Sequence, residues 1–262
     1  MIPDETFAGA HMDISSAYFS EIGSRSRNQD AVGCVVAERH ACFVVSDGIA
    51  STPGGEVAAQ HAVKQILAQG GARAMATPDI AACIEDANAA ILAEQARSTD
   101  RRKMGATVAA LFIDRMTRSA QWAHLGDSRL YHFRHGSLMQ RTRDHSLLQR
   151  MTDAGLSVNG ISASLLDSAL GMPGKIAPCI APTMPLEDGD VFLLCTDGLW
   201  HAVPDTLIER HLRIVNKADD WLSLLRHEVC KQRGPTAPAD NCSALAVWVG
   251  RPEEATLLRI SA

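Results

Sequence analysis

Carboxylates at the ends of apolar runs are the residues of this sequence best placed to do chemistry. Asp47 and Gly48 follow the apolar run 43–45, and Asp197 follows a similar run at 192–195. A buried strand that ends in this way carries its carboxylate to the rim of a sheet, where glycine leaves the next carbonyl oxygen uncrowded. One such Asp-Gly pair is common in structural turns. Two of them indicate a functional site.

Further aspartates stand beside predicted strands: Asp30 starts one, Asp127 lies between two, and Asp240 precedes the last. Taken alone, Asp127 would be expected to bond only its own backbone, as turn aspartates usually do. If the strand ends converge, however, several carboxylates share one small volume. Two unit charges about 4 Å apart repel by roughly 4 kcal/mol at an effective dielectric of about 20. Such a cluster therefore needs cations.

The ligand types select the cation. Oxygen ligands suit Mg²⁺ or Mn²⁺ rather than zinc. The seven cysteines lie scattered without a CxxC pair. This spacing favours small buried residues over zinc ligands or disulfides. Two such ions about 3.5 to 4 Å apart would lower the pKa of a shared water and aim it at an electrophile such as phosphorus. The pattern therefore predicts hydrolysis by a metal-held nucleophile.

The first half of the chain must supply a sheet and a helix layer to position these acids. Strands are predicted at 14–22 and 31–37. Apolar residues then recur with helical spacing over 56–68. A second helix is predicted at 77–96, with Thr77 as its N-cap. Two adjacent amphipathic helices need a common apolar partner, and the face of a sheet provides one.

The middle of the chain predicts a group of antiparallel strands. The connections between the runs 106–113, 119–125 and 128–133 are too short for crossover helices. Both connections are therefore predicted as hairpins, with Asp127 in the second hairpin turn. A further hairpin turn is expected at 134–137.

The second half begins with a short helix, which is predicted to be capped by Asp144 and stopped by Gly155. No period is evident over 157–185, and a long irregular segment inside a compact domain is usually a functional flap or a disordered loop. A flap is favoured. The remaining elements are a strand at 191–196, helices at 205–215 and 219–231, a Pro-rich linker at 234–239 and a strand at 244–249.

Length and composition favour one catalytic domain over 13–250, with a disordered lead at 1–12 and a tail at 251–262. The 262 residues are 46% hydrophobic and carry a net charge of −5 without a block of Lys and Arg. This charge pattern argues against a nucleic-acid or membrane surface. The chain has no apolar run of about 18 residues and no signal-peptide pattern at its N-terminus. A cytoplasmic location is expected.

Seven short motifs resemble, in the same order, those of metal-dependent serine/threonine protein phosphatases of the 2C type, in particular bacterial-type single-domain members. Together they span about 14–249. They are Gly23-x-Arg25-x-x-Asn28-x-Asp30, Ser46-Asp47-Gly48, Met104-Gly105-Ala106-Thr107, Gly126-Asp127-Ser128-Arg129, Asp144-His145-Ser146, Cys195-Thr196-Asp197-Gly198 and Asp240-Asn241. The resemblance implies an α+β fold, a four-layer αββα sandwich of two antiparallel sheets flanked by helix pairs. It also implies a binuclear Mn²⁺ or Mg²⁺ centre at one end.

The same resemblance assigns roles to individual residues. Asp47 would bridge both ions, and the carbonyl oxygen of Gly48 would bind one of them. Asp30 would hold the second ion largely through water, and Asp127 would serve a third, weaker site shared with a strand-end aspartate. The implied metal residues are Asp30, Asp47, Gly48, Asp127, Asp197 and Asp240.

Arg25 is implied to bind the substrate phosphate, because a guanidinium fork matches two phosphate oxygens. Without the resemblance, Arg25 and Arg27 would be interpreted as exposed residues of a solvated turn, and Arg27 keeps that interpretation. The chain departs from the family at Gln29, where Glu is usual, and at Ile49, so no histidine is available there as a general acid. Trp200 is interpreted as a packing residue.

The expected activity is hydrolysis of phosphoserine and phosphothreonine in proteins by a metal-bridging hydroxide, without a phosphoenzyme. The expected partner is a phosphorylated protein, a bacterial Ser/Thr kinase or its target, and the enzyme is expected to act as a monomer. The first motif, with Asn28, Gln29 and Asp30, also resembles members that work in secretion-system control. The alternatives are a non-catalytic regulatory module with the same fold and a metal-dependent hydrolase of small phosphate esters.

Overall fold

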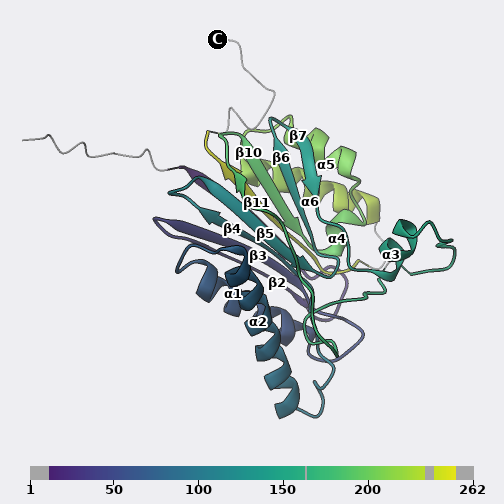
Figure 1. The fold of residues 1–262 in the computed structure, drawn as a ribbon. Helices are drawn as coiled ribbons and strands as arrows, with labels where there is room; N and C mark the ends of the chain where they lie inside the picture. Colours follow the sequence, from purple (N-terminus) through teal and green to yellow (C-terminus); the bar gives the residue numbers. More distant parts are fainter. Residues whose placement is uncertain (1–11, 163, 234–238, 252–262) are drawn as a thin grey trace, which may run out of the picture.

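The computed structural model describes residues 12–162, 164–233 and 239–251, which form two antiparallel sheets packed face to face (Figure 1). The first sheet has the strand order β1 (Ile14–Glu21), β11 (Cys242–Val249), β10 (Asp190–Cys195), β6 (Arg129–Arg134) and β7 (Ser137–Arg141). The second has the order β2 (Asp30–Val36), β3 (His40–Asp47), β4 (Val108–Asp114), β5 (Ser119–Leu125) and β8 (Cys179–Ile180), and the short β9 (Met184–Pro185) also pairs with β5.

Helices cover the outer face of each sheet (Figure 1). The helices α1 (Gly55–Gly70) and α2 (Thr77–Arg97) pack on the second sheet, and α5 (Asp205–Leu212) and α6 (Ala218–Arg233) pack on the first. Two short helices, α3 (Leu147–Asp153) and α4 (Asp197–Trp200), complete the described helices. The predicted α+β sandwich is confirmed. No helix in the described part of the chain is both long and apolar enough to span a membrane.

Apolar clusters hold the four layers together. Phe43 and Phe192 belong to the cluster between the two sheets. Ile66 of α1 and Ile84 of α2 lie in the cluster on the second sheet, and Trp221 of α6 lies in the cluster on the first. These helical residues are fully buried. The predicted apolar faces of the helices are therefore the faces that cover the sheets.

The connection between β5 and β6 is not the predicted hairpin. Because β5 belongs to the second sheet and β6 to the first, Gly126 and Asp127 carry the chain from one sheet to the other. Gly126 has a φ of 100°, and a Cβ atom there would lie 2.6 Å from Cγ2 of Thr107. Glycine is required at this crossing. Asp127 consequently lies between the two sheets, 4% exposed, rather than in a hairpin turn.

The predicted cap of α2 is wrong by one residue. Ala76 precedes the helix, and its N–H donates to the carboxylate of Asp79 at 3.2 Å. Thr77 is the first residue inside the helix, and its hydroxyl accepts from the side-chain amide of Gln121 at 2.9 Å. The threonine hydroxyl therefore joins the helix to the sheet, while the aspartate satisfies the free N–H group.

The predicted cap of α3 is also wrong. Ser146 is the N-cap, and its hydroxyl accepts from the N–H of Gln149 at 3.2 Å. Asp144, which was expected there, forms an ion pair with Arg129 at 2.7 Å. A distant guanidinium competes better for a carboxylate than a backbone N–H does, because it offers two parallel charged hydrogen bonds.

Met12, the last residue of the predicted disordered lead, is 2% exposed, and its carbonyl oxygen accepts from Arg115 at 2.9 Å. The rest of the predicted lead, residues 234–238 of the predicted linker and residues 252–262 of the predicted tail lie outside the described residues. Among the described residues of 157–185, β8 and β9 are the strands and no helix is present. The role of this segment as a flap stays a prediction.

The close approach of α1 to the second sheet gives a stability prediction. A Cβ atom at Gly70 would lie 2.6 Å from Sγ of Cys42 and 2.8 Å from the ring of Phe112. We expect Gly70→Ala to lower the free energy of unfolding by about 1 to 3 kcal/mol because of this overlap, although alanine favours helices by about 1 kcal/mol. Urea unfolding followed by circular dichroism measures the change.

The control is Ala68→Gly at an exposed position of the same helix, which should cost about 1 kcal/mol through helix propensity alone. A Gly70→Ala variant more stable than wild type would contradict the close packing of helix and sheet.

Candidate metal centre

The register of the second sheet brings two predicted metal residues together. Asp30, the first residue of β2, lies opposite Asp47, the last residue of β3. The next residue, Gly48, forms an isolated bridge to Ala106. The carboxylates of neighbouring strands therefore leave the same end of this sheet.

The first sheet brings the other aspartates to the same place. Cys195 of β10 lies opposite Arg129 of β6, where their ladder ends. Asp127 precedes this pair by two residues and Asp197 follows it by two, so both leave the ladder at one end. Asp240 stands two residues before the start of β11.

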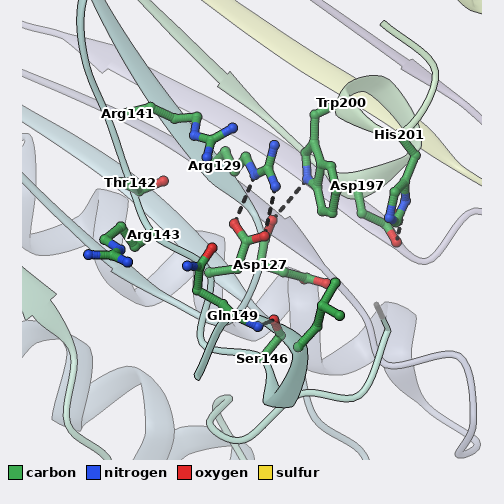
Figure 2. A network of polar contacts seen from close by, with 12 residues as sticks. Asp127, Arg129, Arg141, Thr142, Arg143, Ser146, Gln149, Asp197, Trp200 and His201 are labelled. Carbon is green, nitrogen blue, oxygen red and sulfur yellow. Dashed lines mark hydrogen bonds and ion pairs between the residues drawn. The ribbon is translucent and has the colours of Figure 1, made fainter. Parts of the chain in front are cut away.

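A cavity of about 230 Å³ lies at this end of the sandwich. Asp127, in the connection between β5 and β6, and Asp197, the first residue of α4, both line it. The carboxylate of Asp197 also lies 3.6 Å from Nδ1 of His201 (Figure 2). Asp30 does not line the cavity, whereas Asp47, its partner in the ladder, does. The predicted residues that line the cavity are Arg25, Asp47, Gly48, Asp127, Asp197 and Asp240.

Thr107 fixes the backbone of Asp47 from the neighbouring chain segment. Its N–H donates to the carbonyl oxygen of Asp47 at 2.8 Å, and its hydroxyl accepts from the N–H of Asp47 at 3.1 Å. The same hydroxyl lies 2.6 Å from that of Ser128, which couples the position to the segment of Asp127. The sequence alone indicates no role for Thr107 or Ser128, although both belong to the motifs that resemble the family.

Gly48 is required by the close approach of the next loop. A Cβ atom there would lie 2.2 Å from the carbonyl oxygen of Gly55, at the start of α1. Its N–H donates to the carbonyl oxygen of Gln29 at 3.0 Å, and Ile49 donates to Gly105 at 2.9 Å. The loop that follows Asp47 is thus held on both sides by backbone bonds.

Burial and mutual repulsion raise the pKa values of the clustered aspartates. Burial raises the pKa of Asp47 well above its usual range, and the charges of Asp30 and Asp197 raise it further. Burial and the carboxylate of Asp197 raise the pKa of Asp127 to about 7. Burial raises the pKa of Asp197 as well, the neighbouring His201 lowers it, and the charge of Asp240 raises it again. The raised pKa values show that burial and mutual repulsion outweigh the positive charge beside these acids.

Asp30 has one satisfied and one unsatisfied carboxylate oxygen. Its Oδ2 accepts from the hydroxyl of Thr196 at 2.9 Å, whereas Oδ1 is buried without a hydrogen-bond partner. Burial raises its pKa to about 6, against the hydrogen bonds that lower it. A buried carboxylate oxygen without a partner is costly, and a bound cation or its water would satisfy it.

The donor set fits a hard divalent cation. The cavity offers carboxylate and carbonyl oxygens, which Mg²⁺ and Mn²⁺ prefer. Within the described residues, no three His, Cys, Asp or Glu side chains close around a single point. One reason is that Asp240 turns to Arg25, whose Nη2 atom donates to it at 2.7 Å. The residues thus suit the cations in type and charge, and their metal roles remain a proposal.

Arg25 lies at the edge of this cavity with its side chain 48% exposed. The hydrogen bond and charge of Asp240 raise its pKa above the ordinary value. One guanidinium carries five N–H donors, so donors remain for a second anion. By contrast, Arg27 forms an ion pair with Glu56 and is 73% exposed, as expected for a solvated residue.

Asn241 orders the loop that carries Arg25. Its side-chain oxygen accepts from the N–H of Gln29 at 2.9 Å. Its side-chain amide donates to the carbonyl oxygens of Ile22 and Arg27 at 2.8 and 3.0 Å. The sequence placed Asn241 in a motif, but only the structure shows this role.

A larger cavity of about 530 Å³ lies beside α3. Three arginines border it, and each has an acidic partner. The pairs are Arg141 with Asp205, Arg143 with Asp153, and Arg150 with Asp167. Because its charges are balanced, this cavity lacks the excess of acids that marks the smaller one.

The crowding of acids predicts opposite effects of Asp47→Asn with and without metal. In EDTA the variant should melt above wild type, because it removes a buried charge that its neighbours repel; each kcal/mol of relieved repulsion corresponds to about 2 to 4 °C. In Mn²⁺ the wild type should gain stability and the variant should not. Differential scanning fluorimetry measures both effects.

The control is Asp100→Asn in the exposed loop after α2, which should leave both melting temperatures unchanged. A variant that is less stable than wild type in EDTA would contradict the repulsion among the acids.

Comparison with known proteins agrees with this geometry. The chain is 29% identical over 202 residues to the serine/threonine protein phosphatase PstP of Mycobacterium tuberculosis, covering 74% of this chain and 38% of that protein. It thus spans well under half the length of that relative. It is 28% identical over 215 residues to the serine/threonine phosphatase stp of Listeria monocytogenes, covering 76% and 84%.

Solved structures give the same result. The catalytic domain of PstP, in complex with 2 manganese ions, superposes with a TM-score of 0.77 at 27% identity, covering 91% of this chain and 99% of that one. The profile of the protein phosphatase 2C family matches residues 19–234. This match covers most of both sheets and the residues that line the cavity except Asp240 and Asn241, and the chain belongs to the protein phosphatase 2C family.

Proposed function

We propose that this protein hydrolyses phosphoserine and phosphothreonine in proteins with the help of two divalent cations, Mn²⁺ or Mg²⁺. The observation that carries the proposal is the cavity in which Asp47, Asp127, Asp197 and Asp240 meet beside Arg25. A cluster of acids attracts cations, and an adjacent guanidinium attracts phosphate. Phosphate ester hydrolysis needs both.

The cations, when bound, supply a water of lowered pKa and neutralise charge that develops on the phosphoryl oxygens. Asp47 and the carbonyl oxygen of Gly48 would hold them on the side of the second sheet. Asp197 and Asp240 would hold them on the side of the first sheet. Asp30 lies behind Asp47 and would act through a water. Asp127 would serve a third ion shared with a neighbouring acid.

Arg25 would bind and orient the phosphoryl group at the mouth of the cavity. Arg25 now pairs with Asp240 at 2.7 Å. When cations and a phosphate bind, Asp240 would pair with a cation and Arg25 with the phosphate. No histidine is among the described residues that line the cavity. With no histidine among these lining residues, water would supply the proton to the serine or threonine leaving group.

Residues of 157–185 supply the substrate-facing rim. Ser164 and Leu166 line the cavity, and Leu165 beside them is 50% exposed. We propose that this rim contacts the peptide chain of a phosphoprotein substrate. The phosphoryl group of such a substrate comes from a serine/threonine kinase, so we propose that the protein opposes one. Action as a monomer in the cytoplasm is the accompanying expectation.

The purified protein should release phosphate from a phosphothreonine peptide in Mn²⁺. This release should stop in excess EDTA. Asp47→Asn should lower kcat/KM by more than about 100-fold, because it removes a direct ligand.

The comparison substrate is a free small phosphate ester, on which kcat/KM should be lower. A preference for the small ester would favour a metabolite hydrolase. Turnover in EDTA, or full turnover by the variant, would remove the proposed mechanism. A wild type without any turnover would favour a regulatory module.

Arg25→Lys should raise KM for the phosphopeptide by about tenfold with a smaller change in kcat. Lysine keeps the charge and loses the paired donors, which are worth about 1.5 kcal/mol. Steady-state kinetics measures both constants. Arg27→Lys is the matched control two residues away, and it should leave KM unchanged. Equal effects of the two variants would contradict the assigned role.

A further inference from the structure

The chain segments that carry Asp127 and Asp197 are joined by a contact outside the sheet. The β6–β10 ladder ends at the pair Arg129 and Cys195. Both acids lie beyond it, where strand hydrogen bonds no longer fix their separation. Trp200, at the end of α4, reaches back from the Asp197 segment to the Asp127 segment (Figure 2).

Two contacts hold the Trp200 ring against the other segment. Its Nε1–H donates to the carbonyl oxygen of Asp127 at 3.0 Å. Its ring lies under the guanidinium of Arg129, with Cζ 3.5 Å from the ring centroid. Both partners belong to the segment of Asp127, so the indole bridges the segments by a hydrogen bond and a cation–π contact.

Arg129 is itself held rigidly. Its Nε and Nη2 atoms donate to the two carboxylate oxygens of Asp144 at 2.8 and 2.7 Å, and its Nη1 donates to Tyr131 at 3.3 Å. The Arg129 and Asp144 side chains are 10% and 9% exposed. A bidentate ion pair of this kind fixes the plane of the guanidinium. The plane available to Trp200 is therefore set before any cation arrives.

We infer that Trp200 and Arg129 are positioning residues that hold Asp127 and Asp197 at the separation needed to share a divalent cation. Neither side chain lines the cavity, so neither touches the cation or the substrate. Their effect passes through the backbone: the indole holds the carbonyl oxygen of Asp127 from one end of α4, and Asp197 stands at the other end. This inference rests on the proposed metal site.

The test is Trp200→Phe, which keeps an aromatic ring under Arg129 and removes the N–H donor. Mn²⁺ binding to the full chain is measured without substrate, from free Mn²⁺ by electron paramagnetic resonance. Loss of one hydrogen bond should raise the dissociation constant of the weakest ions about fivefold. The Kd of the tightest ion should be unchanged.

Trp221→Phe is the matched control. Trp221 also donates its indole N–H to a backbone carbonyl, that of Ile208, at 3.1 Å. It lies in the cluster under α6 instead of beside the cavity. This variant should bind Mn²⁺ as wild type does. A second test, Arg129→Lys, removes the fork that binds Asp144 and should weaken the same class of ions.

The outcomes are separable. Weaker Mn²⁺ binding in Trp200→Phe and Arg129→Lys, with Trp221→Phe unchanged, supports the inference. Unchanged binding in Trp200→Phe and Arg129→Lys overturns it. Equal weakening in both tryptophan variants, together with equal losses of melting temperature in EDTA, also overturns it, because the effect would then be general stability. Failure of the wild type to bind Mn²⁺ overturns the proposed metal site, and the inference falls with it.

Discussion

Repulsion among acids at one end of the sandwich is the constraint that the rest of this structure must withstand. Burial raises the pKa of Asp47 most, and the charges of Asp30, Asp197, Asp127 and Asp240 raise it further. Asp30 and Asp47 cannot move apart freely, because the ladder between β2 and β3 holds their backbones. The Trp200 hydrogen bond to Asp127 joins the segments of Asp127 and Asp197 beyond the ladder of the first sheet. The apolar layers beneath them are fully buried. Burial of these apolar residues thus offsets the repulsion among the carboxylates in the folded protein.

Two sheets achieve this better than one. A single antiparallel sheet would spread these strand ends along its rim, about 5 Å from one strand to the next. Facing sheets bring ends from both layers around one cavity, and the chain that crosses between them at Gly126 carries Asp127 into the gap. Thr107 then joins the layers, since its hydroxyl contacts both Asp47 and Ser128.

Much of this was predictable because it depends on local pattern. Asp47 and Asp197 were identified from apolar runs that end in Asp-Gly, and helix faces from their periodicity. The misses concern partners that are distant in sequence. Gly126-Asp127 has the composition of a hairpin turn, and only the packing of two sheets makes it a crossing. Asp144 has the composition of a helix cap, but Arg129 binds its carboxylate.

The pair of Arg129 and Asp144 is hard to explain by stability. Removing two charged groups from water is costly, and a well-packed apolar pair of similar volume is often as stable. A buried ion pair instead fixes an orientation, because two parallel hydrogen bonds define a plane. Here that plane lies 3.5 Å from the centre of the Trp200 ring. The ion pair therefore fixes the orientation of the Arg129 guanidinium beside Trp200. A site built on mutually repelling acids needs fixed orientations more than additional apolar contact.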